Sequence, residues 1–311
     1  MLSLIIPVYR NEGSLPDLLL AVDELNSTFD GALEVVFVID GSPDKCYEIL
    51  MRELPSQKIK SQLILLSKNF GSFMAIRTGL QYATGEYFAV MAADLQEPPD
   101  LIVKINQALH LEEIDVVVAA REGRHDPLLS KLLSKLYWWF YRKYVIHEIP
   151  AGGVDMFGCN KEFRDTLLTL DERHSSLIGQ IFWLGFRRKT VFYKRQTRQH
   201  GKSAWTFAKK LNYLMDSIFS FTDLPIRILI RVGAGGALLV AMISLVVVVA
   251  RLRGLIEVPG YAMTILIITF LGCLNLLGLG IVGSYAWRTY ENTKNRPLAI
   301  PMRVNVFRKV L

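Results

Sequence analysis

The segment with the clearest chemical potential is Met91 to Asp100, where acidic and amide side chains follow an apolar run. Tyr87 to Met91 has the composition of a buried strand, and Asp94 and Gln96 come shortly after it, before two prolines that can open a helix. Carboxylate and amide oxygens at the end of a strand can hold a hard divalent cation against a diphosphate. Asp94 could equally cap the following helix, and this segment alone leaves both interpretations open.

The elements that would position these residues form a β-α-β series. Apolar runs rich in Val, Ile and Leu alternate with amphipathic stretches, and we expect strands at Leu2 to Val8, Glu34 to Ile39, Gln62 to Leu66, Tyr87 to Met91 and Asp115 to Ala120. Such a series predicts a parallel sheet covered by helices on both faces, with ligands at the carboxyl ends of its strands. Polar residues cluster at those ends, in Tyr9–Glu12, Asp40–Asp44, Lys68–Gly71, Asp94–Gln96 and Arg121–Arg124.

Several other functional signatures are missing or misplaced. No GxGxxG or GxxxxGK[ST] motif occurs at the strand ends, which disfavours dehydrogenases and P-loop proteins. The GxGxxG match at Gly278 to Gly283 lies inside an apolar stretch, where small residues favour close helix packing. The three cysteines lack CxxC spacing and the five histidines lack metal-ligand spacing, so neither predicts a metal site.

The composition predicts membrane segments. Of the 311 residues, 51% are hydrophobic, which excludes a disordered chain and a disulfide scaffold. Two uncharged stretches, Val232 to Ala250 and Val258 to Trp287, reach the length of about 20 residues that a spanning helix needs. The short polar turn between them predicts a transmembrane hairpin, and two buried core helices are the alternative.

The net charge of +7 supports a topological interpretation. The tail after Trp287 has a net charge of +5 and the hairpin +1, which leaves +1 for residues 1–231. Basic residues next to a membrane segment mark the cytoplasmic side and argue against nucleic acid as the partner. Arg251 and Arg253 in the turn are a weak contrary signal. With no signal peptide at Met1 to Tyr9, we expect a multi-pass protein of the inner (cytoplasmic) membrane with both termini in the cytoplasm.

Two further segments have the composition of membrane-surface helices. Residues 127–144 combine Lys131, Lys135, Arg142 and Lys143 with Trp138, Trp139 and Phe140, which is typical of an interfacial helix. A helix that faces the protein core is the alternative. Trp205 to Ile230 also mixes aromatic, leucine and lysine residues and is expected to lead the soluble domain onto the bilayer.

Four segments together resemble a known family: Leu4–Glu12, Val38–Asp44, Ala92–Pro99 and Arg195–Ser203. They are similar to signatures of family 2 glycosyltransferases with the GT-A fold, and the last two are typical of polyprenyl-phosphate sugar transferases. The bactoprenol (undecaprenyl-phosphate) glucosyltransferases are the nearer resemblance and dolichol-phosphate mannose synthases the more distant one. The resemblance implies a GT-A domain at 1–204, juxtamembrane helices at 205–230, a hairpin at 231–287 with spans at about 232–250 and 262–287, and a basic cytoplasmic tail at 288–311.

The resemblance also implies roles for individual residues. Residues that match the nucleotide-binding positions are Pro7, Tyr9, Glu12 and Asp40, with Lys68 and Asn69 in a loop near that pocket. Asp94 and Gln96 match metal ligands, which implies Mg²⁺ or Mn²⁺ as the cofactor, and Arg121 matches an arginine that faces the phosphates. Positions that match the acceptor-phosphate site are Lys131, Lys135, Arg198 and Ser203. Asp155 matches an acidic position after the sixth strand, near the sugar.

The activity that the resemblance implies is inverting transfer of a sugar from a UDP-sugar, such as UDP-glucose, to undecaprenyl phosphate at the cytoplasmic membrane face. This chemistry serves cell envelope polysaccharide biosynthesis, and a homo-oligomer is possible. Attack by an acceptor phosphate, which is already an anion, needs little help from a general base. The sugar itself is not readable from the sequence, because specificity depends on a few pocket contacts.

One position departs from the family pattern. Ala92 stands where the family usually has the first Asp of its Asp-x-Asp motif, so a cation would depend on Asp94, Gln96, donor phosphates and water. A catalytically impaired, nucleotide-sugar-binding membrane scaffold is therefore the alternative function. A processive polysaccharide synthase is disfavoured, because two spans offer no obvious export channel and a Gln-x-x-Arg-Trp motif is absent.

Overall fold

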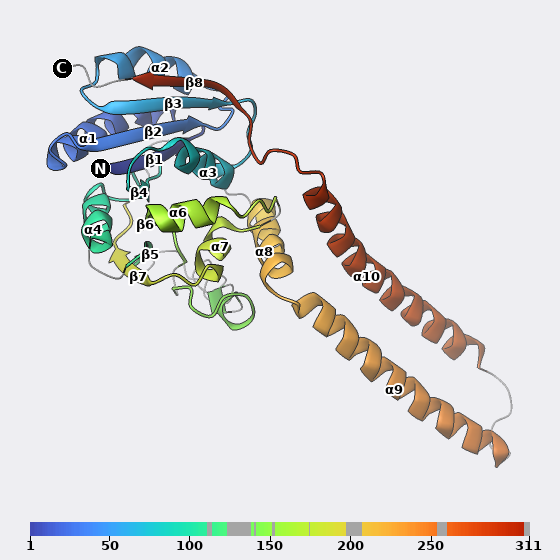
Figure 1. Cartoon of the computed structure of the whole chain (residues 1–311). Helices are drawn as coiled ribbons and strands as arrows, with labels where there is room; N and C mark the ends of the chain where they lie inside the picture. The colour runs from blue at the N-terminus through green and yellow to red at the C-terminus, as the bar shows by residue number, and fades with distance from the viewer. Residues whose placement is uncertain are drawn as a thin grey trace.

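The computed structural model describes residues 1–110, 114–122, 138–139, 141–150, 153–173, 175–196, 207–253 and 260–307. Its sheet domain contains one eight-stranded sheet with helices on both faces, and two long helices lead away from this domain (Figure 1). The predicted α/β class is confirmed.

The five strands expected from the sequence are confirmed to within two residues at each end. They are β1 (Leu2–Val8), β2 (Leu33–Ile39), β3 (Lys60–Leu66), β4 (Tyr87–Val90) and β5 (Val116–Arg121). The sheet order is β7-β5-β6-β4-β1-β2-β3-β8. Strand β1 pairs in parallel with β2 and β4, β2 with β3, and β5 with β7. The carboxyl ends of these strands therefore share one edge of the sheet.

Strand β6 (Met156–Asn160) runs antiparallel to its neighbours β4 and β5. Its beginning, and not its end, therefore lies at the edge where the parallel strands finish. Asp155 immediately precedes this strand, so the expectation that it follows the sixth strand is wrong. The antiparallel direction still brings Asp155 to the carboxyl ends of β4 and β5, because opposite ends of antiparallel strands meet.

Helices cover both faces of the sheet. On one face lie α1 (Leu15–Thr28), α2 (Cys46–Glu53) and α4 (Asp100–Leu109). On the other face lie α3 (Ser72–Tyr82), α6 (Lys161–Leu168) and α7 (Leu177–Trp183). The fully buried strands β1 and β2 contribute alternate residues to the two faces, which explains their continuous apolar sequences.

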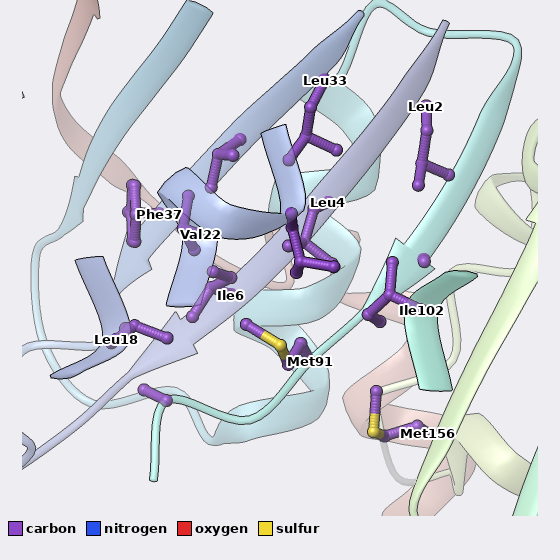
Figure 2. Packing of buried hydrophobic residues seen from close by; sticks show 14 of the residues in the cluster. Leu2, Leu4, Ile6, Leu18, Val22, Leu33, Phe37, Met91, Ile102 and Met156 are labelled. Carbon is purple, nitrogen blue, oxygen red and sulfur yellow. The ribbon is translucent and has the colours of Figure 1, made fainter. Parts of the chain in front are cut away.

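The core beneath α1 shows how sequence spacing produces this packing. Leu18 and Val22 lie four residues apart on one face of the helix and meet Ile6 and Phe37 of the sheet (Figure 2). Each of these side chains is buried. Pro16 lies in the first turn of α1, where the lack of an N–H costs no helical hydrogen bond. Helix α1 therefore begins directly after the loop that leaves β1.

The sheet ends in a strand that the sequence analysis did not anticipate. Strand β8 (Pro301–Phe307) pairs antiparallel with β3, and Asn305 Nδ2 donates to the Tyr47 hydroxyl on α2 at 3.1 Å. The tail is therefore more than a basic extension, and the sheet domain is not confined to residues 1–204. The strand occupies an edge of β3 that would otherwise expose unpaired backbone groups.

Three helices connect the two parts of the sheet domain: α8 (Phe207–Phe221), α9 (Leu224–Leu252) and α10 (Tyr261–Thr293). Helices α9 and α10 extend away from the sheet, and the chain returns through α10 to β8 (Figure 1). A Cβ placed on Gly278 of α10 would lie 3.3 Å from Leu229 Cδ1 of α9, so glycine permits close contact there. Within the described residues, one helical stretch, Ile267–Thr293, is long and apolar enough to cross a membrane.

A charged cluster holds the amino ends of β5 and β7 (Arg188–Tyr193) together. Arg187 donates from its backbone N–H, Nε and Nη2 to the carboxylate of Asp115, at 3.1, 2.9 and 3.0 Å, and Asn160 Nδ2 donates to it at 3.0 Å. These hydrogen bonds, with Arg187 the largest contributor, lower the pKa of Asp115 below its usual value. The far ends of the same two strands reach the candidate site.

We therefore expect Asp115→Asn to destabilise the sheet domain by about 2 kcal/mol at neutral pH, because charge-assisted hydrogen bonds are lost. A lowered carboxyl pKa contributes stability above the usual value and loses it as the pH falls through the folded-state pKa. The gap in thermal stability between wild type and variant should therefore narrow below about pH 4. Thermal unfolding of both proteins in detergent at a series of pH values measures this gap. A gap that widens on acidification would contradict a stabilising role for the ionised Asp115 carboxylate.

Strand β8 yields a second prediction. Removing residues 300–311 should lower the unfolding temperature of the sheet domain by several degrees, because the edge of β3 loses its backbone partner. The matched control is a Met302→Ser, Val306→Ser double variant, which changes exposed side chains but keeps the backbone ladder. Equal unfolding temperatures for the truncated and full-length chains, measured by the same thermal scan, would rule out a stabilising role for β8.

Candidate active site

The loops after β1 and β2 hold each other through side chain to backbone hydrogen bonds. The backbone N–H of Arg10 donates to Ser42 Oγ at 2.7 Å, and that of Glu12 donates to Asp44 Oδ2 at 3.2 Å. Glu12 Oε2 in turn accepts from the Lys45 N–H at 3.2 Å. Partial burial raises the pKa of Asp44, but hydrogen bonds led by that from Ser42 outweigh it and lower the pKa overall. The two predicted nucleotide-binding loops thus form one unit.

Asp40 connects this unit to the loop after β3. Its side-chain oxygens accept from the backbone N–H groups of Phe70 at 2.7 Å and Gly71 at 2.9 Å, and the residue is only 2% exposed. Gly41 follows with φ +56°, and a Cβ there would lie 2.2 Å from the Lys68 carbonyl carbon. Only glycine allows this approach. In this structure Asp40 therefore positions the loop that carries the exposed residues Lys68 and Asn69.

The loop after β4 brings oxygen atoms together in a strained turn. Leu95 has φ +53°, which is uncommon for a residue with a branched side chain and typical of functional sites. The Gln96 N–H donates to Asp94 Oδ1 at 3.4 Å, and Ser14 Oγ donates to the Ala93 carbonyl at 2.9 Å. The turn therefore places the side chains of Asp94 and Gln96 beside the loop after β1.

Glu97 is a residue of this turn to which the sequence analysis gave no role. It is 3% exposed, and burial raises its pKa to about 7, partly opposed by the charge of Arg195. Its Oε2 is buried without a hydrogen-bond partner within the described part of the chain. Its place between Gln96 and two prolines was the only sequence signal for it, because burial of a carboxylate does not show in a local pattern.

Arg121 and Asp155 form the central ion pair of the site. Arg121 donates from Nε and Nη2 to the two oxygens of Asp155, and the side chains are 20% and 21% exposed. The Tyr193 hydroxyl donates to Asp155 Oδ2 at 2.7 Å. Burial lowers the pKa of Arg121, but its contacts with Asp155 outweigh this and raise it overall. The sequence placed Arg121 and Asp155 in one site without predicting that they pair, and it missed Tyr193.

The end of β7 reaches the loop after β4 at a second point. Arg195 Nη2 donates to Gln96 Oε1, and Arg195 Nε lies 3.7 Å from Glu97 Oε1. The backbone N–H of Gln196 donates to the Gln96 carbonyl oxygen at 2.9 Å. Strands β4, β5, β6 and β7 thus converge on one cluster: Asp94, Gln96, Glu97, Arg121, Asp155, Tyr193 and Arg195.

All four residues predicted for the acceptor-phosphate site lie outside the described residues: Lys131, Lys135, Arg198 and Ser203. The neighbouring residues 138–139 and 141–144 are described, and they include both an exposed and a buried aromatic side chain. Trp139 is 48% exposed, and Lys143 Nζ lies 4.9 Å from its ring centre. Tyr141 is fully buried in the core beneath α3, α6 and α7.

The residues present fit a hard divalent cation that takes only part of its ligands from protein. Asp94 and Gln96 supply oxygen donors, the type that Mg²⁺ and Mn²⁺ prefer. No group of three His, Cys, Asp or Glu side chains within the described residues is arranged to hold a metal. Such a cation would therefore need donor phosphates or water to complete its shell, as Mg²⁺ commonly does.

Comparison with known proteins identifies the class of protein that this sheet and site define. Residues 3–169 match the family described as Glycosyl transferase family 2. This match covers more than half of the chain, and the chain belongs to glycosyltransferase family 2. It is accordingly a glycosyltransferase, as the sequence resemblance implied.

Relatives resemble the chain over nearly its whole length. The putative glycosyltransferase CsbB of Bacillus subtilis is 33% identical and covers 100% of this chain and 94% of its own. The prophage bactoprenol glucosyl transferase homolog of Escherichia coli is 29% identical, covering 97% and 99%. The undecaprenyl-phosphate 4-deoxy-4-formamido-L-arabinose transferase of Pseudomonas paraeruginosa is 28% identical, covering 96% and 88%. These names give no support to the non-enzymatic scaffold alternative.

Solved structures align with part of the chain at lower similarity. The mannosyl-3-phosphoglycerate synthase of Rubrobacter xylanophilus aligns over 75% of each chain with 14% identity and a TM-score of 0.47. The Pyrobaculum calidifontis mannosyltransferase PcManGT, solved with GDP-Man and Mn²⁺, aligns over 61% of this chain and 54% of its own, with 19% identity and a TM-score of 0.41.

The contact between Tyr193 and Asp155 yields a prediction about the site. Tyr193→Phe removes one of three donors to this carboxylate, and one hydrogen bond of about 1.4 kcal/mol corresponds to about a tenfold loss in kcat/KM for sugar transfer. Steady-state kinetics with donor and acceptor varied in turn measures the loss. Tyr47→Phe is the control, because it also removes a hydroxyl with a tertiary hydrogen bond, but on α2. Equal kcat/KM in Tyr193→Phe and wild type would show that the hydrogen bond from Tyr193 to Asp155 does not contribute to sugar transfer.

Proposed function

We propose that this glycosyltransferase transfers a sugar from a UDP-sugar to a polyprenyl phosphate, with inversion at the anomeric carbon, at the cytoplasmic face of the membrane. The observation that carries the proposal is the cluster at the carboxyl edge of the sheet, where Arg121 and Tyr193 hold the Asp155 carboxylate beside the turn of Asp94 and Gln96. UDP-glucose is the donor we favour from the resemblance to bactoprenol glucosyltransferases.

The donor half of the site would use the joined loops after β1, β2 and β3. Tyr9, Glu12 and Lys68 lie on these loops at the surface or partly exposed, within reach of a base and ribose. Their mutual hydrogen bonds preorganise the loops, which lowers the ordering cost of binding. Asp94 and Gln96 would hold Mg²⁺ or Mn²⁺, which when bound stabilises negative charge on the departing diphosphate.

Asp155 and Arg121 would act on the sugar and its leaving group. The three hydrogen bonds to Asp155 hold the carboxylate in one orientation, from which it can stabilise positive charge that develops on the sugar ring. Arg121 places a positive charge at the same edge, where it can screen the repulsion between donor diphosphate and acceptor phosphate. Because the acceptor is already an anion, direct displacement needs alignment more than a general base, and displacement from one side inverts the sugar.

The helices would bring the site to its lipid acceptor. A polyprenyl chain leaves the bilayer at a cost of roughly 0.8 kcal/mol per CH₂, so the enzyme must work at the membrane. A chain that crosses through α9 and returns through α10 emerges on the side it left, and β8 then pairs with β3 of the same sheet. This pairing supports a hairpin with the sheet domain and C-terminal strand on one side. Lys131, Lys135, Arg198 and Ser203 are proposed to meet the acceptor phosphate.

The names of relatives support the acceptor class. Two of them are named for undecaprenyl phosphate or bactoprenol, and each covers at least 95% of this chain. The sugars in the two names differ, a glucosyl group in one and a formamido-arabinose in the other. The shared element is therefore the lipid phosphate, and the donor sugar is to be identified by experiment.

The proposal is tested by radiolabelled sugar transfer from UDP-glucose and other nucleotide sugars to undecaprenyl phosphate with Mg²⁺ or Mn²⁺. We expect Asp94→Ala and Arg198→Ala to lower kcat/KM by at least about a hundredfold, since each removes an electrostatic contact to the reacting phosphates. Asp23→Ala, at an exposed position on α1, is the control and should behave as wild type. Full activity in both Asp94→Ala and Arg198→Ala would contradict the assignment of these residues to the active site.

A further inference from the structure

Arg195 is a residue of the site for which neither the sequence motif nor the proposed reaction provides a role. Its guanidinium donates to Gln96 Oε1 and approaches Glu97 Oε1 to 3.7 Å. The backbone fixes this arrangement, because the Gln196 N–H donates to the Gln96 carbonyl oxygen at 2.9 Å. The end of β7 is thus attached to the turn after β4 by both main chain and side chain.

The chemistry of this contact selects one orientation of the Gln96 side chain. A glutamine carboxamide can present either its oxygen or its NH₂ group in a given direction, and only the oxygen can ligate a cation. A guanidinium has donors and no acceptor, so Arg195 favours the orientation in which the oxygen of Gln96 faces it. A carbonyl oxygen has two lone pairs, and it can accept a hydrogen bond while it ligates a cation.

Glu97 lies where its carboxylate can offset the positive charge of Arg195 beside Gln96. An arginine beside a cation site repels the cation unless a negative group offsets its charge. The Glu97 side chain is 4% exposed and lies against Arg195, in a setting where solvent screens little. Arg195 is itself 31% exposed, so its outer part remains at the surface of the site. In its ionised form Glu97 can therefore offset part of the charge that Arg195 brings beside Gln96.

We propose that Arg195 is a positioning residue that holds the Gln96 carboxamide with its oxygen directed for ligation of the divalent cation that accompanies the donor diphosphate. The proposal rests on the proposed function, because it assumes that Gln96 is a cation ligand. It adds a residue from the segment that follows β7 to a cation site whose ligands come from the turn after β4. It also gives the buried carboxylate of Glu97 a purpose as the counter-charge of Arg195.

The test compares Mn²⁺ binding to the full-length protein in detergent with saturating UDP, measured from the electron paramagnetic resonance signal of free Mn²⁺. Arg195→Met keeps much of the apolar stem and removes all donors, and we expect about a tenfold to hundredfold weaker Mn²⁺ affinity, the range for residues that orient a metal ligand. Arg195→Lys restores a single donor group and should recover part of the affinity. Lys189→Met removes a positive charge from an exposed position on β7, the strand that precedes Arg195, and is the matched control.

Unchanged or tighter Mn²⁺ binding in Arg195→Met would overturn the proposal, and so would an equal loss in Lys189→Met. Thermal unfolding accompanies each titration, and if Arg195→Met is unfolded, Arg195→Lys decides: it should bind Mn²⁺ more weakly than wild type at the same unfolding temperature. Wild-type protein that neither binds Mn²⁺ with UDP nor transfers sugar would overturn the proposed function as well. Wild-type transfer with equal Mn²⁺ affinity in all variants would overturn the role of Arg195 alone.

Discussion

The structure of the site depends on the ion pair between Arg121 and Asp155. Arg121 ends a parallel strand, whereas Asp155 begins an antiparallel one, and only this reversal brings the two side chains to the same edge of the sheet. The forked guanidinium occupies both oxygens of the carboxylate, and the Tyr193 hydroxyl adds a third hydrogen bond. A carboxylate held in this way is preorganised for an electrostatic role, because it needs little reorientation when charge develops nearby.

The loops after β1, β2 and β3 are arranged by hydrogen bonds of another kind, in which backbone N–H groups donate to side-chain oxygens. Asp40 accepts from Phe70 and Gly71, while Asp44 and Glu12 accept across the loops after β1 and β2. Asp40 and Glu12 were expected to contact a nucleotide, and in the structure they also hold the loops that would do so. Net charge contributes little to this arrangement, since the basic excess lies in the tail and individual placed residues determine the local field.

Strand β8 links the helices to the sheet domain. The chain leaves this domain through α8 and α9, returns through α10 and completes the sheet beside β3, with Asn305 bonded to Tyr47 of α2. The helices are therefore attached to the sheet domain at both ends, which restricts how far the site can move relative to them. Under the proposed function, this double attachment would limit how far the site can move relative to a lipid acceptor held in the bilayer.

The sequence by itself determined the β-α-β series, the five strands β1 to β5, the polar strand ends and the family, because periodicity and motifs are properties of short segments. It also placed Asp94, Gln96, Arg121 and Asp155 in one site through the resemblance. The tertiary structure alone decided the direction of β6 and the return of β8 to β3. It also decided the contacts of Glu97, Tyr193 and Arg195 in the site. These features depend on contacts between residues far apart in the chain, such as Arg195 with Gln96 and Arg121 with Asp155. No local pattern records a contact of that kind, since the energy of burial and pairing arises only when the segments meet.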